Sequence, residues 1–348
     1  MAAFTRFTAR RSIRLLVVGC GSMAQGWVER ILNKPGLELI GLVDIRPAAA
    51  ARTATFFKLE QLPRFTSLAA ALRATRPDAV VDITVPAAHH PVTLAALRAG
   101  CHVLGEKPLA DSLVHARAMC RAAARVRRLY MVTQNRRHLD GMVAMQDAIR
   151  RATIGRLSSL DADFFIGAHF GGFRDLMDNP LLLDMAIHSF DQARMISGCD
   201  PLTVYCHEYH PHGSWYRGAA AAVCIFEFTR GVLFTYRGSW AAEGFNTSWE
   251  CSWRAHGARG ALRWDGRDAP RLQRPVGKTG LVHKVTESVL SAPALVHIGH
   301  HGVLDEFVRC LRSGARPQSE CHDNIKSLAM CLAAVESTRR GRKVAVRW

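Results

Sequence analysis

The sequence has no run of eighteen consecutive apolar residues, and it therefore predicts no membrane-spanning helix. It also lacks a CxxC pair, although it contains 10 cysteines at irregular spacings. Cysteines without a paired pattern are typical of a protein in a reducing compartment rather than of a disulfide-bonded secreted protein. These absences predict a cytoplasmic protein that has no membrane partner.

Long basic blocks are also missing. The formal net charge is +17, yet the chain contains no block of five or more basic residues. Its arginines are spread through the chain, as on a solvated surface, so we predict no nucleic-acid partner. The positive charge would still attract an anionic substrate.

The histidine clusters lack the spacing of a metal site. Two groups are close in the sequence, one at His207, His210 and His212, the other at His297, His300 and His301. Neither combines a helical HxxxH spacing with a nearby third ligand, which zinc sites require. The sequence thus predicts no metal site.

The first residues look like a targeting signal. Arg10-Arg11-Ser12-Ile13-Arg14 stands before an apolar run, as in a twin-arginine signal, and an acid-free, arginine-rich start is also typical of a transit peptide. The apolar run over residues 13–18 is too short for an export signal, and cleavage after it would remove the first strand. We predict instead a basic arm over residues 1–12.

A glycine-rich fingerprint follows the first predicted strand. Residues 13–18 are typical of a buried parallel strand and lead into Gly19-Cys20-Gly21-Ser22-Met23-Ala24. In this GxGxxA pattern the first glycine permits a tight turn and the second lets a pyrophosphate approach the backbone. The alanine lets the next helix pack closely on the strand. The amides at the start of that helix would bind the phosphates.

A carboxylate follows the second predicted strand. Residues 37–43 form that strand, and Asp44 comes twenty positions after Ala24. An acid in this place accepts hydrogen bonds from the adenosine ribose and repels a 2′-phosphate, which predicts NAD. Arg46 would instead receive a 2′-phosphate, so NADP stays open as the alternative cofactor.

Strand–helix units continue along the first part of the chain. Strands are predicted at 79–85, 101–104 and 129–133, and helices at 91–99 and 111–127. Such units predict a doubly wound parallel sheet in a dinucleotide-binding domain over residues 13–135. Ligands bind beyond the carboxyl ends of parallel strands, where this prediction places Gly19, Asp44, Thr84 and Lys107.

Lys107 stands out because only 7 of the 46 basic residues are lysines. An ammonium group that is buried can shift its pKa and pass protons, whereas a guanidinium cannot. The proline that follows favours an extended backbone and so constrains the direction of the lysine. A lysine in Gly105-Glu106-Lys107-Pro108, after a nucleotide fingerprint, predicts an enzyme rather than a binding module.

The pattern changes after Gly155. Longer strands that are rich in aromatic residues are predicted at 157–166, 202–209, 221–229, 232–239 and 248–255. They predict a mostly antiparallel, open sheet in an α+β substrate domain over residues 136–348.

One predicted helix of this domain carries ionisable side chains. It spans residues 180–191 and begins at a proline, which suits the first helical turn. Asp184 and His188 are four positions apart and so project from one face, which Asp191 continues. The carboxylates would orient the imidazole and raise its basicity, as a general base needs. A histidine buried in the core is the alternative.

Together, the residue 19–24 fingerprint, Glu106-Lys107-Pro108 and Asp184-x-x-x-His188-x-x-Asp191 resemble the Gfo/Idh/MocA family. This family includes glucose–fructose oxidoreductase and inositol dehydrogenase, and the resemblance covers nearly the whole chain. Residues 84–89 resemble its cofactor-side loop. Met177-Asp178-Asn179-Pro180 departs from the glycine run that many members have at this place.

The resemblance implies a Rossmann domain and a second domain whose sheet often mediates dimers or tetramers. It implies that Lys107, Asp184 and His188 are catalytic and also contact the substrate. Further cofactor contacts are implied on the loops at Thr84, Pro86, His89 and Glu106. The implied substrate is a sugar, a sugar derivative or an inositol, oxidised or reduced at a CH–OH carbon.

Three further residues are candidate contacts to substrate hydroxyls, namely Arg137, His169 and Trp240. Each has a structural alternative. Arg137 would brace the domain junction, His169 would lie in a turn, and Trp240 would belong to the core.

Two other functions stay open. An NAD-dependent glycosidase on the same fold would oxidise its substrate transiently and would not accumulate NADH. A non-catalytic NAD(P)-binding sensor would not need the lysine, aspartate and histidine, and their presence favours an enzyme.

Overall fold

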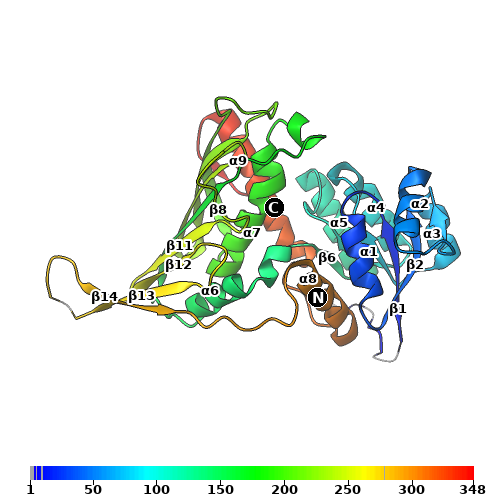
Figure 1. Ribbon diagram of the computed structural model, residues 1–348, viewed down its shortest axis with the longest axis horizontal. Coiled ribbons are helices and arrows are strands. Elements are labelled where there is room, and N and C mark those ends of the chain that lie inside the picture. The colour runs from blue at the N-terminus through cyan, green and yellow to red at the C-terminus, as the bar shows by residue number, and fades with distance from the viewer. Residues whose placement is uncertain (1–3, 5, 9–10, 278) are drawn as a thin grey trace. The chain divides into compact units, whose positions relative to one another are not determined.

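The computed structural model describes residues 4, 6–8, 11–277 and 279–348, and these form two compact units. The first unit consists of the chain up to Gln134 together with His300–Ile325, and the second of Asn135–Gly299 together with Lys326–Trp348. Each unit has its own sheet (Figure 1). Part of the predicted basic arm, including Arg10, lies outside the described residues.

The sheet of the first unit has six strands in the order β3-β2-β1-β4-β5-β6, and every pairing is parallel. The strands are β1 (Ile13–Val18), β2 (Leu37–Val43), β3 (Arg64–Phe65), β4 (Ala79–Asp82), β5 (His102–Gly105) and β6 (Tyr130–Val132). From β1 the chain first adds strands on one side and then, from β4, on the other side. This order confirms the predicted doubly wound sheet.

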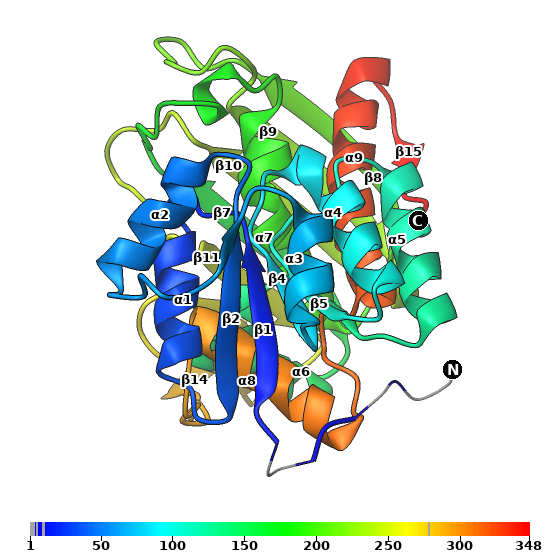
Figure 2. The same ribbon diagram turned by 90° about the vertical axis from the view of Figure 1, so that its right-hand side faces the viewer.

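Helices cover both faces of this sheet, which is why its central strands are almost wholly apolar (Figure 2). They are α1 (Ala24–Leu32), α2 (Pro47–Phe56), α3 (Leu68–Thr75), α4 (Pro86–Arg98) and α5 (Leu113–Val126). Helix α4 begins five residues before its predicted start, because Pro86 occupies its first turn and Pro91 lies inside it.

Helix α8 (Gly299–Ser313) belongs to the first unit although it comes late in the chain. Its Val303 and Phe307 share a buried core with Trp27 and Ile31 of α1. The sequence prediction put every residue after 135 in the second domain, and no local pattern marks the return of α8 to the first.

The second unit contains a nine-stranded sheet in the order β14-β13-β12-β11-β7-β10-β9-β8-β15. Only β10 and β7 pair in parallel, so the predicted, mostly antiparallel sheet is confirmed. The strands are β7 (Leu157–Phe165), β8 (Pro201–Tyr209), β9 (Ala221–Phe228), β10 (Leu233–Ser239), β11 (Ser252–Gly257), β12 (Gly260–Trp264), β13 (Arg271–Val276), β14 (Lys284–Val289) and β15 (Val344–Ala345).

One face of this sheet is covered by helices α6 (Asp140–Arg150), α7 (Ala186–Ser197) and α9 (Cys321–Arg340) (Figure 1). Every residue of α7 is buried. The hairpin of β13 and β14 extends beyond the rest of the sheet, and β14 is exposed along its whole length. Within the described part of the chain, no helix is long and apolar enough to cross a membrane.

Candidate active site

The fingerprint turn connects β1 to α1 and requires glycine at its first position. Gly19 has a φ of +96°, and a Cβ added there would lie 2.7 Å from the backbone of Ile83. Gly21 is exposed, and a Cβ added there would meet no atom within 4 Å. Ser22 and Met23 are also exposed, ahead of the first residue of α1. The turn therefore leaves room beside Gly21 for a ligand phosphate, as the fingerprint predicts.

The two glycines should respond differently to alanine. Gly19→Ala should lower the free energy of unfolding by about 1–3 kcal/mol, because it forces a side chain into a left-handed conformation against Ile83. Gly21→Ala should leave the Tm near that of the wild type but raise the Kd for NAD about tenfold or more. Thermal unfolding and NAD titration of both variants measure these effects. Unchanged NAD affinity in Gly21→Ala would place the pyrophosphate elsewhere.

Asp44 is buried at the end of β2, beside the fingerprint turn. Its Oδ2 accepts a hydrogen bond from the backbone N–H of Cys20 at 2.8 Å, and its Oδ1 accepts one from the N–H of Arg46 at 2.8 Å. The exposed Arg46 side chain places Nε 3.6 Å from Oδ1. The carboxylate is thus fixed next to the phosphate turn, where an adenosine ribose binds in this fold.

The loop after β4 is tied to the segment after β5 by one buried histidine. His89 lies on α4, and its ring nitrogens contact the carbonyl oxygens of Thr84 at 3.0 Å and Pro108 at 2.8 Å. Thr84 donates its hydroxyl to Asp82 at 2.6 Å, and Pro86 fills the first turn of α4. Lys107 directly precedes Pro108, so His89 links the position of the lysine to that of Thr84.

Lys107 is half-buried just beyond the end of β5, next to a buried acid. The Glu106 carboxylate accepts a hydrogen bond from Trp27 Nε1 at 2.9 Å, and His300 Nε2 lies 3.8 Å away. Burial raises the pKa of Glu106, although the Trp27 hydrogen bond and the charge of Lys107 act the other way. Burial and nearby cations, Lys107 among them, lower the pKa of His300 to about 4.

The sequence predicts that Asp184 and His188 lie on one regular α-helix, and the structure shows that they do not. Asp184 lies in a π-helical turn, Leu181–Met185, and the buried His188 lies in the first turn of α7. The wider turn changes the angle between the two side chains from that of a regular i, i+4 pair. Such π-turns within helices are frequent at functional sites.

Asp184 is held by an arginine that the sequence analysis did not identify. Arg174 Nε donates to Asp184 Oδ2 at 2.6 Å, and its guanidinium lies over the rings of Phe170 and Phe173 at 5.1 and 4.7 Å. Phe170 in turn contacts the indole of Trp240, 5.3 Å between ring centres. Arg174 thereby fixes the carboxylate of Asp184 beside an aromatic surface.

Trp240 is almost fully buried and lies parallel to Tyr216, with 5.9 Å between the ring centres. Its Nε1–H has no hydrogen-bond partner among the described residues, although it is buried. Buried donors are normally satisfied, so this N–H is an exception, but it has no open surface that a substrate hydroxyl could reach. The burial of Trp240 favours the alternative of a core residue.

Arg137 and His169 occupy different environments. Arg137 is buried, and its Nε and Nη2 donate to the two oxygens of Asp191 at 2.6 and 2.7 Å. Ser327 donates to the same carboxylate at 2.7 Å, so Asp191 is fixed from two sides. His169 is exposed, stacks on Trp215 at 3.6 Å and has Nε2 2.9 Å from Glu243. Arg137 therefore acts as a structural brace that holds Asp191, and His169 lies on the surface.

Two regions of the chain match models of one protein family. Residues 13–134 match "Oxidoreductase family, NAD-binding Rossmann fold", and residues 142–263 match "GFO/IDH/MocA C-terminal domain". The chain belongs to the Gfo/Idh/MocA family of oxidoreductases. The family confirms the predicted Rossmann domain and NAD as its cofactor.

This Gfo/Idh/MocA protein resembles characterised relatives over most of its length. It is 28% identical to 1,5-anhydro-D-fructose reductase of Ensifer adhaerens, over 94% of this chain and 96% of the relative. It is 27% identical to D-apiose dehydrogenase of Paraburkholderia graminis, over 94% and 88%. A solved oxidoreductase from Agrobacterium radiobacter, crystallised with NAD+, L-tartaric acid and magnesium, has the same fold. Its TM-score is 0.84 at 22% identity, covering 96% of this chain and 98% of that one.

Proposed function

We propose that this Gfo/Idh/MocA protein oxidises a secondary hydroxyl of a sugar, sugar derivative or inositol with NAD, or catalyses the reverse reduction. The reductase and the dehydrogenase named above are named for sugar substrates, and inositol 2-dehydrogenase of Rhizobium meliloti is 24% identical over 96% of this chain. The observation that carries the proposal is Lys107, half-buried beyond a parallel strand of the unit that holds the NAD fingerprint.

The residues of the first unit fit the cofactor in this proposal. The open backbone at Gly21, Ser22 and Met23, with the start of α1 at Ala24, would hold the pyrophosphate. Asp44 would accept the ribose hydroxyls. The nicotinamide end would lie against the segments that His89 joins, which contain Thr84, Pro86, Glu106 and Lys107. When bound, NAD would supply the acceptor for a hydride.

The catalytic roles fall to three side chains. His188 would remove the proton of the substrate hydroxyl, and on reduction would return it to the same oxygen. Lys107 would donate a hydrogen bond to that oxygen and stabilise its developing negative charge. Asp184, fixed by Arg174, would orient the reacting groups.

The aromatic surface beside Asp184 supports the proposed substrate class. The exposed Phe170 and Phe173 would offer apolar ring faces to the C–H groups of a sugar ring, and the buried Trp240 would act only through Phe170, which it contacts. His169 would contact the substrate only at the rim. Arg137 would act indirectly, through its ion pair with Asp191 of α7.

A screen of sugars, sugar acids and inositols with NAD and with NADP tests this function. NADH should accumulate with at least one compound, and NADP should react more slowly. Release of an aglycone from a glycoside without NADH accumulation would show a glycosidase instead. Tight NAD binding without turnover of any compound would show a sensor.

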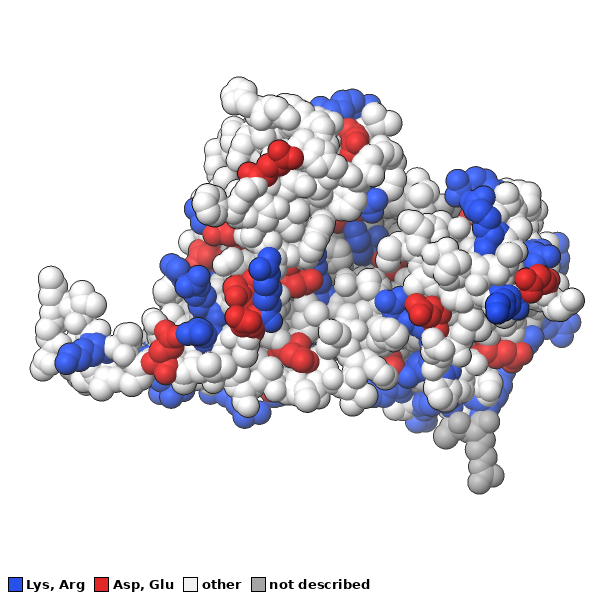
Figure 3. Space-filling model, viewed as in Figure 1, with Lys and Arg blue, Asp and Glu red and all other residues white. Residues whose placement is uncertain are grey.

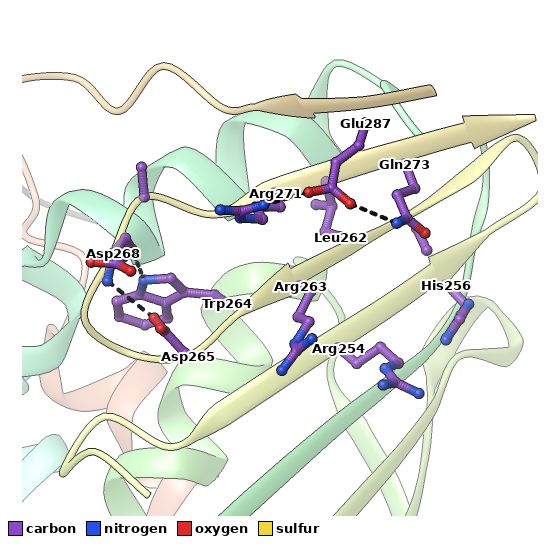
Figure 4. Close-up of a pocket in the computed structure, with 12 residues that line it drawn as sticks. Arg254, His256, Leu262, Arg263, Trp264, Asp265, Asp268, Arg271, Gln273 and Glu287 are labelled. Atoms are coloured by element: carbon purple, nitrogen blue, oxygen red, sulfur yellow. Dashed lines mark hydrogen bonds and ion pairs between the residues drawn. The ribbon is translucent and has the colours of Figure 1, made fainter. Parts of the chain in front are cut away.

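A second copy of the chain is the proposed partner, bound to the sheet face opposite the helices. That face exposes the apolar side chains of Leu202, Tyr205, Val223, Ile225 and Leu233. Beside them, strands β11 to β14 form a hollow of about 600 Å³ with charged walls, which include Arg254, Arg263, Arg271 and Glu287 (Figure 4). Large exposed apolar patches with polar rims mark protein interfaces.

Ile225→Lys should therefore shift a homodimer or homotetramer toward the monomer, because it places a charge in the apolar patch. Light scattering after gel filtration measures this, with the exposed Lys58→Met as the control. A wild-type monomer, or a variant as large as the wild type, would contradict the proposed interface.

The last two parts of the proposal concern nucleic-acid binding and the location in the cell. On the face seen in Figure 3, basic and acidic side chains are interspersed and form no continuous basic stripe, so no nucleic-acid partner is included. All 10 cysteines are free thiols, which supports a cytoplasmic location.

A further inference from the structure

The segment that leads from β7 to the π-turn carries the side chains around Asp184. We define the substrate-side loop as residues 166–180, which contain Phe170, Phe173 and Arg174 and end directly before the π-turn. Whatever fixes this loop in the second unit also fixes the ring faces and the arginine that the proposed substrate would meet.

Backbone hydrogen bonds hold the middle of the substrate-side loop against the segment before β9. The N–H of Arg217 donates to Asp175 O at 2.7 Å, and the N–H of Ala219 donates to Asp178 O at 3.0 Å. Between these two bonds, a Cβ added at Gly218 would overlap the backbone of Asp178, so the close approach requires glycine. These contacts hold the loop up to residue 178 but do not reach the π-turn.

A side-chain hydrogen bond holds the end of the substrate-side loop. Asn179 Nδ2 donates to Glu208 Oε2 at 2.6 Å, and Glu208 lies on β8 with its side chain on the buried face of the sheet. The carbonyl oxygen of Asn179 accepts the N–H of Leu183 at 3.1 Å, at the start of the helical segment that contains Asp184. Asn179 thus joins the carboxylate of Glu208 to the turn that presents Asp184.

An acid is unusual on this buried face. Glu208 is only 8% exposed, and its Oε1 is buried without a hydrogen-bond partner among the described residues. Burial raises the pKa of Glu208 to about 7, although the hydrogen bond from Asn179 acts the other way. A buried acid without a cation beside it lowers the stability of a fold. The hydrogen bond to Asn179 is therefore what the Glu208 side chain contributes.

We propose that Glu208 is a positioning residue, which through Asn179 fixes the turn that presents Asp184 to the substrate. This role rests on the proposed function and assigns no chemistry to Glu208 itself. A carboxylate accepts a shorter and stronger hydrogen bond from an amide than a neutral acceptor does. The ionised Glu208 thus holds the end of the loop more firmly than a glutamine in the same place.

The attachment of β8 to α9 does not need the Glu208 side chain. The backbone N–H of Glu208 donates to Thr338 Oγ1 at 3.1 Å, and the Thr338 hydroxyl donates to the carbonyl oxygen of Cys206 at 3.1 Å. Both bonds use the backbone of β8, so they remain possible when the Glu208 side chain is removed. A variant at this position therefore tests the contact with the loop.

Amide hydrogen exchange of the whole chain tests the proposal without a substrate. In Glu208→Ala, the amides of residues 171–184 should exchange at least about fivefold faster than in the wild type, because the end of the loop loses its side-chain anchor. Asn179→Ala should have the same effect, and Glu208→Gln, which keeps a neutral acceptor, should lie between. Glu336→Ala is the matched control, because it removes only surface ion pairs of α9, and it should exchange as the wild type does.

Steady-state kinetics with the compound that reacts fastest in the screen give the second measurement. KM should rise about tenfold in Glu208→Ala and about threefold in Glu208→Gln, while kcat should change less than about threefold in both. The double variant Glu208→Ala/Asn179→Ala should have the KM of either single variant, because all three lack the same contact.

Loop exchange in Glu208→Ala as slow as in the wild type would overturn the proposal, and so would unchanged KM in the folded variant. A lower Tm with unchanged loop exchange would make Glu208 a structural residue. If the wild type turns over no compound, the proposed function fails, and the exchange of residues 171–184 still shows whether Glu208 holds the loop.

Discussion

Replacement of Lys107 by methionine should lower kcat about 10²–10³-fold, the loss expected when one hydrogen-bond donor to a developing oxyanion is removed. Methionine keeps much of the length of the lysine side chain but cannot donate. The Kd for NAD should change little, because the pyrophosphate turn at Gly21 and the carboxylate of Asp44 lie on other loops. Steady-state kinetics and NAD titration measure the two quantities separately.

Lys58→Met is the matched control, because Lys58 is an exposed lysine of the same unit. It should leave kcat and NAD affinity unchanged. Near-native kcat in Lys107→Met would remove the lysine from the chemistry. A loss confined to NAD affinity would make Lys107 a cofactor contact rather than a catalytic residue.

His188→Gln should lower kcat about 10²–10⁴-fold, the usual contribution of a positioned general base. Glutamine keeps most of the volume of the buried imidazole but cannot accept the hydroxyl proton. The remaining oxidation rate should rise steadily with pH, because hydroxide then takes the place of the missing base. The kcat of both proteins measured across a range of pH shows the difference.

The exposed His212→Gln, in a loop outside the sheet, serves as the control for replacing a histidine in the same unit. Thermal unfolding of both variants separates a loss of chemistry from a loss of fold. If His188→Gln unfolds earlier but retains its kcat while folded, His188 is a core residue and another group is the base.

The sequence predicted the first unit well because its signals are local. Strand β1 matches its predicted range, since a strand covered on both faces is an unbroken apolar run between turn residues. The fingerprint and Asp44 follow β1 and β2 directly, so chain order alone placed them at one edge of the sheet. Strand β14 gave no such signal, because all its residues are exposed.

The sequence named candidate residues for the site but did not predict the contacts between them. Spacing singled out Asp184 and His188, and the family resemblance implied their catalytic roles, yet the π-turn between them has no signature in that spacing. Arg174 is ten positions from Asp184. Sequence spacing does not reveal such a partner, because the contact depends on how the loop between the two residues folds.

Transfer of deuterium tests the proposed chemistry most directly. A polyol or sugar that reacts in the screen is labelled with deuterium on the carbon of the reacting CH–OH group, and the reduced cofactor is analysed by mass spectrometry. The label should appear in NADH, and its transfer should slow in both Lys107→Met and His188→Gln. Product that forms with unlabelled NADH, or with the label lost to water, would contradict hydride transfer from that carbon.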